Sequence, residues 1–169
     1  PSFRYLHDSA PPVIRDVAEP KLTPLRVTAD KALRFGMLES DAIVHAKWAV
    51  YDPQNAGAPV SFRENGSKAE HLALVLYGYE ARTMAALPPN TPTEVCAERL
   101  ATREGASVVV IKMGPAGALV WTKGSAQTVP AYRTKTVWKI GSGDTFAAHF
   151  AWAWMHEGKA PVEAAAWAS

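Results

Sequence analysis

The sequence predicts an α/β protein whose sheet is mostly parallel and is flanked by helices. Two observations support this prediction. Residues 72–76 and 107–111 are short runs of apolar or β-branched residues, the pattern of strands that are buried on both faces of a sheet. Helical patterns alternate with such runs along the chain, and helical crossovers are the connections that parallel strands need.

The composition is that of an ordinary globular domain. The chain has 169 residues, of which 48% are apolar and 20% are charged. Its formal net charge of +2 is too small to indicate a nucleic acid or a membrane surface as a partner. Cys96 is the only cysteine, and no apolar run approaches the roughly 20 residues of a membrane span. We therefore expect a cytoplasmic protein.

The two ends of the chain differ from its middle. Residues 1–24 are rich in proline and are expected to form an extended arm or a broken loop segment, whereas residues 25–169 are interpreted as one partial α/β domain. The sequence begins with Pro1 and stops inside an alanine-rich helical pattern. We therefore expect the chain to be an incomplete piece of a larger fold.

Local signals indicate where the elements begin and end. Ser67, followed three residues later by Glu70, forms a capping box, which predicts that a helix starts there. Pro92 suits the first position of a helix, and Lys123-Gly124 suits the turn of a hairpin. The expected strands are 25–27, 42–46, 48–51, 72–76, 107–111, 118–121 and 126–129, and the expected helices are 80–87, 92–103, one from the loop at Gly141 to His156 and one from Pro161.

Three loops that carry glycine or charge follow Leu76, Ile111 and Ile140, and we expect them to share one crevice, because ligands of parallel α/β sheets bind beyond the carboxyl ends of strands. The last loop reads Gly141-Ser142-Gly143-Asp144 and precedes a helical pattern, where unpaired amides and the helix dipole favour an anion. An aspartate there suits a base that deprotonates a hydroxyl attacking phosphorus. Alternatively, the four residues are a glycine turn with an aspartate N-cap.

The other two loops fit the same interpretation. Lys112, Gly114 and Gly117 offer a charge for phosphates and a backbone that can lie against a nucleotide, although a plain turn between strands is the alternative. Glu80 is placed to hold Mg²⁺ through water, or else is a solvated glutamate in the first turn of a helix. Neither the P-loop pattern GxxxxGK[ST] nor GxGxxG is present at these positions.

Together these stretches resemble the ribokinase or PfkB-type carbohydrate kinase family, over roughly residues 40–169. The family's D-T-T-G-A-G-D stretch corresponds to residues 138–144, its N-x-x-E segment to 77–80, and its K-x-G-x-x-G-A turn to 112–118. The resemblance implies a ribokinase-like fold and a kinase that moves the γ-phosphate of ATP to a hydroxyl of a sugar, nucleoside or related small molecule. It also implies Mg²⁺ as a cofactor and pairing into a homodimer.

The resemblance further implies a role for each matching residue. The family's aspartate is a catalytic base, and the amides before it form an anion hole for charge on the transferred phosphoryl group. The expected site residues are the base Asp144, the anion-hole residues Gly141, Ser142 and Gly143, the nucleotide-binding residues Lys112, Gly114 and Gly117, and the magnesium-ordering residue Glu80.

The sequence departs from the family at two places. Tyr77 replaces the asparagine of N-x-x-E, and Trp138-Lys139-Ile140 replaces a segment that helps to bind a monovalent cation in many members. We hypothesise that the Lys139 ammonium substitutes for this cation, so that activity would not respond to K⁺. The family's substrate segment, lid and adenine segment are not recognisable, and we expect this chain alone to be a weak kinase or an inactive one. The alternative is a degenerate member that binds nucleotide or sugar without catalysis.

Overall fold

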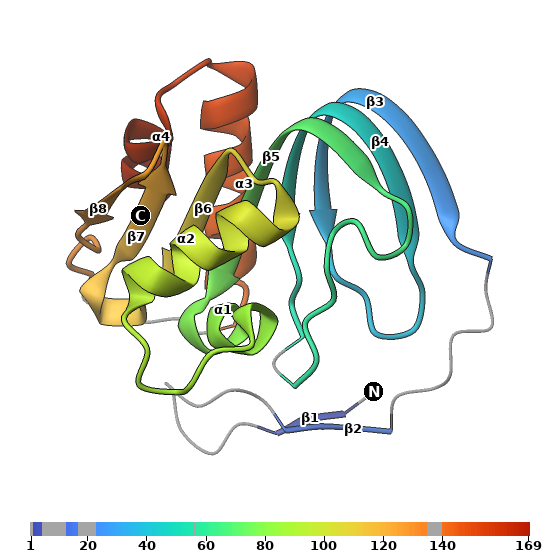
Figure 1. The fold of residues 1–169 in the computed structure, drawn as a ribbon, viewed down its shortest axis with the longest axis horizontal. Helices are drawn as coiled ribbons and strands as arrows, with labels where there is room; N and C mark the ends of the chain where they lie inside the picture. The colour runs from blue at the N-terminus through green and yellow to red at the C-terminus, as the bar shows by residue number, and fades with distance from the viewer. Residues whose placement is uncertain (1, 5–12, 17–22, 56, 135–139) are drawn as a thin grey trace.

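The computed structural model describes residues 2–4, 13–16, 23–55, 57–134 and 140–169, and its centre is a six-stranded sheet (Figure 1). Strands β3 to β6 are parallel, whereas β7 and β8 are antiparallel additions at one edge. The predicted α/β class with a mostly parallel sheet is therefore confirmed. In spatial order the strands are β3 (Leu25–Phe35), β4 (Ala42–Asp52), β5 (Lys68–Tyr77), β6 (Val108–Lys112), β7 (Ala118–Thr122) and β8 (Ser125–Val129).

Helices cover both faces of the sheet, and the sheet separates two apolar cores (Figure 1). Successive side chains of a strand point to opposite faces, so that Leu74 and Ile111 lie in one core while Val75 and Val110 lie in the other. This explains why the two apolar runs predicted as buried strands are continuous. One face carries α1 (Gly78–Ala85) and α2 (Thr93–Glu104), and the other carries α3 (Ser142–Ala151), the π-helical segment η2 (Trp152–His156) and α4 (Pro161–Ala168).

The helix expected at Ser67 is wrong, because residues 68–77 form strand β5. The Ser67 hydroxyl accepts a hydrogen bond from the N–H of Val44, at 2.9 Å, instead of capping a helix. Pairing with β4 therefore overrides the local capping signal. The same long-range pairing makes residues 42–52 one strand rather than two, and it extends the strand expected at 25–27 to Phe35.

The other expected elements are present with small shifts at their ends, as helix ends usually show. Helix α1 begins at Gly78 rather than at Glu80, and α2 begins at Thr93, with Pro92 as its N-cap. The hairpin of β7 and β8 turns at Lys123-Gly124, as expected. A short 3₁₀ turn, η1 (Gly114–Ala116), joins β6 to β7.

The segment before β3 contains a small antiparallel pair of strands, β1 (Ser2–Arg4) and β2 (Val13–Arg15), which lies apart from the main sheet (Figure 1). The pairing of these two strands was not anticipated. The domain boundary at residue 24 stays a prediction. None of the helices in the described ranges is long and apolar enough to cross a membrane.

Candidate active site

The carboxyl ends of parallel strands and the amino end of α3 bring the three predicted loops together. Strands β5 and β6 end at Tyr77 and Lys112, which are paired in the sheet, and β4 ends beside them at Asp52. A cavity of about 510 Å³ opens at this edge, a volume within the range of small-molecule sites. Six of the predicted site residues line it: Lys112, Gly114, Gly117, Gly141, Ser142 and Gly143.

The amino end of α3 forms one wall of the cavity. Gly141 is the N-cap of α3 and has a φ of 83°, in the left-handed region that glycine adopts readily. The first amides of a helix have no partner within it, which makes this wall suitable for an anion. A Cβ at Gly143 would lie 2.7 Å from the Tyr77 hydroxyl, so this glycine lets the end of β5 approach α3 closely.

Asp144 is the third residue of α3, so the alternative prediction of an aspartate N-cap is wrong. Its side chain is exposed, and Oδ1 accepts a hydrogen bond from the Gln54 side-chain amide. Gln54 also lines a second cavity, of about 370 Å³, together with residues 36–40 and Phe3. Asp144 directly follows Gly143, which lines the first cavity, and it is hydrogen-bonded to Gln54, which lines the second.

Lys112 forms a buried ion pair beneath the first cavity. Its Nζ lies 2.6 Å from Oδ2 of Asp52 and 4.2 Å from the centre of the Tyr77 ring. Burial raises the pKa of Asp52 above its usual value, while the charge of Lys112 acts in the opposite direction. An ammonium has three donors, and Asp52 is its one hydrogen-bond acceptor among the described residues. Lys112 can therefore also donate to an anion in the cavity.

The two glycines of the nucleotide turn differ in what they allow. A Cβ on Gly117, which has a φ of 89°, would lie 1.9 Å from the carbonyl oxygen of Val129, so the fold itself requires glycine there. A Cβ on Gly114 would meet nothing within 4 Å, although its φ of 60° disfavours other residues. Gly114 therefore keeps the cavity wall open, whereas Gly117 first of all lets β7 pack against the end of β8.

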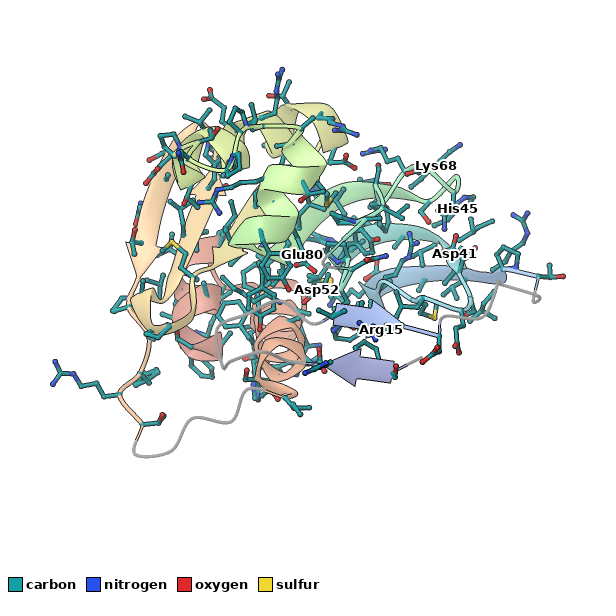
Figure 2. All side chains as sticks on the ribbon, turned by 90° about the horizontal axis from the view of Figure 1, so that it is seen from below. Arg15, Asp41, His45, Asp52, Lys68 and Glu80 are labelled. Carbon is teal, nitrogen blue, oxygen red and sulfur yellow. The ribbon has the colours of Figure 1, made fainter. Side chains whose placement is uncertain are left out.

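Glu80 is buried, and the alternative of a solvated glutamate is wrong. Its Oε2 accepts the N–H of Tyr77 at 2.8 Å, and burial is the main cause that raises its pKa to about 7. Asp52 and Lys112 also act on this pKa, and Figure 2 shows Glu80 near Asp52. No cluster of three metal-ligating side chains occurs in the described ranges, and Glu80 does not line the cavity. The role predicted for Glu80 in ordering Mg²⁺ through water therefore stays a prediction.

Two predicted residues are not described by the structure, and two residues of the site were not predicted. Trp138 and Lys139 lie outside the described residues, so the cation hypothesis stays a prediction. Asp52 and Gln54 were not predicted as site residues. The only sequence signal for Asp52 was its place at the end of an apolar strand before Pro53, and Gln54 had none.

Solved kinases share this fold. Ribokinase from Thermotoga maritima matches with a TM-score of 0.54 and 24% identity, over 75% of this chain and 40% of that protein. Phosphofructokinase-2 from Escherichia coli matches with a TM-score of 0.54 and 17% identity, over 73% of this chain and 38% of that protein. Fructokinase from Vibrio cholerae O395 was solved with fructose, ADP and calcium. It matches with a TM-score of 0.51 and 19% identity, over 73% of this chain and 42% of that protein. The chain thus spans about two fifths of the length of these relatives.

No curated protein matches the sequence. Residues 73–169 match the family described as "pfkB family carbohydrate kinase". This range is more than half of the chain and includes α3 and the turn after β6. This match agrees with the fold of the solved relatives and confirms the resemblance inferred from the motifs. The chain belongs to the pfkB family of carbohydrate kinases.

Proposed function

We propose that this chain forms the phosphate-binding part of a kinase that transfers the γ-phosphate of ATP to a hydroxyl of a sugar, nucleoside or related small molecule. One observation carries the proposal: Lys112 and the amino end of α3 line one cavity, and the exposed carboxylate of Asp144 follows directly. An ammonium and the amides at the amino end of a helix both stabilise negative charge, and an exposed carboxylate can accept a proton from an alcohol.

The proposed role of each residue follows from its position in the site. The amides of Gly141, Ser142 and Gly143 stabilise charge on the transferred phosphoryl group, and Lys112, which lines the same cavity, binds the phosphates. Asp144 takes the proton of the acceptor hydroxyl as the oxygen attacks phosphorus. ATP, when bound, supplies the phosphoryl group. Gly114 leaves room for the nucleotide, because this residue carries no side chain and the space beside it is open.

The second cavity is the place we propose for the acceptor. Its lining combines polar Glu39, Ser40 and Gln54 with apolar Met37 and Leu38, which suits a ligand that has both hydroxyls and a carbon skeleton. Gln54 donates a hydrogen bond to Asp144, so an acceptor bound in the second cavity lies on the same side of the site as the proposed base. Binding of fructose by the fructokinase relative supports a sugar as the acceptor class.

A second candidate function is binding without catalysis. Tyr77 is the observation in its favour, because this residue stands in place of the family's asparagine and its hydroxyl packs against Gly143 in the anion-binding wall. In such a protein the cavity would bind nucleotide or sugar for regulation. Pairing into a homodimer and a cytoplasmic location stay predictions under either function.

The experiment compares the wild-type complete protein with Asp144→Asn, using Mg-ATP and a panel of sugars and nucleosides. We expect the variant to lose about 100-fold to 10,000-fold in kcat while its affinity for ATP is retained. Asp30→Asn, a change of an exposed aspartate on β3, is the matched control and should behave as the wild type. Equal and negligible turnover in all three proteins, with ATP still bound, would instead support the binding function.

A further inference from the structure

A chain of contacts joins Lys112 to Asp144 across the strand ends. Lys112 Nζ donates to Oδ2 of Asp52 at 2.6 Å, and Oδ1 of Asp52 accepts the backbone N–H of Gln54 at 3.3 Å. The side-chain amide of Gln54 then donates to Oδ1 of Asp144. Gln54 thus gives one hydrogen bond to each of two carboxylates, and these carboxylates are close enough for the charge of Asp144 to raise the pKa of Asp52.

The turn that carries Gln54 is held firmly. The N–H of Gly36 donates to the carbonyl oxygen of Asp52 at 2.7 Å, and a Cβ on Gly36 would lie 1.8 Å from the carbonyl oxygen of Pro53. Gln54 itself has a φ of 49°, in the left-handed region that a residue with a long side chain seldom adopts. The backbone is therefore fixed in a strained conformation that directs the Gln54 side chain to Asp144.

Stability does not account for this contact. Both Gln54 and Asp144 are partners in an exposed hydrogen bond, and such bonds contribute little to folding because water competes for both groups. The contact instead restrains one oxygen of Asp144. No donor among the described residues bonds its other oxygen, Oδ2, which leaves Oδ2 available for a hydroxyl proton.

We propose that Gln54 is the positioning residue of this site: its side-chain amide holds the Asp144 carboxylate in place, and Asp52 anchors it to the Lys112 side of the cavity. The catalytic meaning of this inference rests on the proposed function, whereas the contact itself does not. A neutral amide suits the role because it donates a hydrogen bond without cancelling the charge that a base needs. Positioning of this kind lowers the cost of reaching the reactive geometry.

The first test needs no turnover. The chain contains two glutamines, Gln54 and Gln127, so selective ¹⁵N labelling of glutamine side chains gives two pairs of amide signals. We expect Asp144→Asn to shift the Gln54 pair and to leave the pair of Gln127, which is exposed on β8, unchanged. Gln54→Ala assigns the signals. Gln54 signals that are identical in wild type and Asp144→Asn would overturn the proposal.

The second test, made at saturating acceptor because Gln54 lines the second cavity, separates positioning from nucleotide binding in the complete protein. We expect Gln54→Ala to lower kcat about tenfold while the dissociation constant of ATP is unchanged, because Gln54 does not line the first cavity. Gln54→Asn tolerates the left-handed backbone but is one methylene shorter, so it should lose kcat as Gln54→Ala does. Gln127→Ala is the matched control and should change neither quantity.

The outcomes are distinguishable. Wild-type kcat in Gln54→Ala, alongside a large loss in Asp144→Asn, overturns the positioning role and leaves the proposed function standing. Absence of turnover in every protein overturns the proposed function, and the amide signals then still decide whether Gln54 holds Asp144. A fall in kcat with a matching fall in ATP affinity also overturns the proposal, since it indicates a general distortion of the site.

Discussion

Two buried cations in this molecule, Arg34 and Lys112, have very different surroundings. Arg34 donates to the Phe62 carbonyl, the Ser67 hydroxyl and Asp41, and its guanidinium lies over the rings of Tyr51 and Phe62. Lys112 has one hydrogen-bond acceptor among the described residues and one ring beside it, and it borders a cavity. The side chains are similarly buried, with exposures of 5% and 7%.

The difference teaches how to distinguish a structural cation from one kept for a ligand. The guanidinium of Arg34 is planar and has several donors, which together tie β3 to β4 and to the loop before β5. The ammonium of Lys112 has three donors and one acceptor among the described residues, which suits the anion-binding role proposed for it. Burial alone therefore does not separate the two roles, whereas the number of protein acceptors does.

The largest expected effect comes from removing the structural cation. Arg34→Met leaves Asp41 and two other acceptors without their partner, and we expect the free energy of unfolding to fall by about 3 kcal/mol. Asp41 is 38% exposed, so the loss stays below that of a fully buried pair. Urea unfolding measures it. Arg26→Met, at an exposed position on the same strand, should change stability by less than about 0.5 kcal/mol, and equal losses in both variants would contradict the assignment.

The next effect concerns Glu80, a buried acid near Lys112. Its pKa is raised from the usual 4.5 to about 7, so the folded state retains a proton that the unfolded chain has already lost. Glu80 therefore favours folding below pH 4.5, and this contribution is lost as the pH rises to 7. Glu80→Gln keeps the capping geometry and removes the titration.

We expect the variant to gain up to about 3 kcal/mol relative to the wild type between pH 4 and pH 8. Unfolding by urea at several pH values measures this difference, because the other titrating groups are common to both proteins. A difference that stays constant with pH would show that Glu80 ionises normally in the folded protein.

The smallest effect on stability is expected for Lys112. Lys112→Met leaves Asp52 without its partner, but burial already raises the pKa of Asp52, so this carboxyl can take up a proton. We expect a loss of about 1–2 kcal/mol in unfolding free energy, together with about tenfold weaker ATP binding measured by calorimetry. Lys68→Met, at the exposed start of β5, is the matched control. Unchanged ATP affinity in Lys112→Met would place Lys112 with Arg34 as a structural cation.

Prediction from sequence succeeded where the signal was local. The strands at 72–76 and 107–111 and the hairpin that turns at Lys123-Gly124 were predictable, because their periodicity and turn residues lie within a few positions of each other. The order of glycines around Lys112 and Asp144 was sufficient to recognise the family. The capping box at Ser67 misled, because the competing partner of that serine is Val44, in another strand.

By itself, the sequence determined the fold class, the family and the set of loops at the strand ends. The tertiary structure alone decided which side chains meet there. Asp52 and Lys112 are 60 positions apart in the chain, and Gln54 and Asp144 are 90 positions apart. Pairs at such separations leave no local pattern, because strand register and helix placement, rather than periodicity, bring them together.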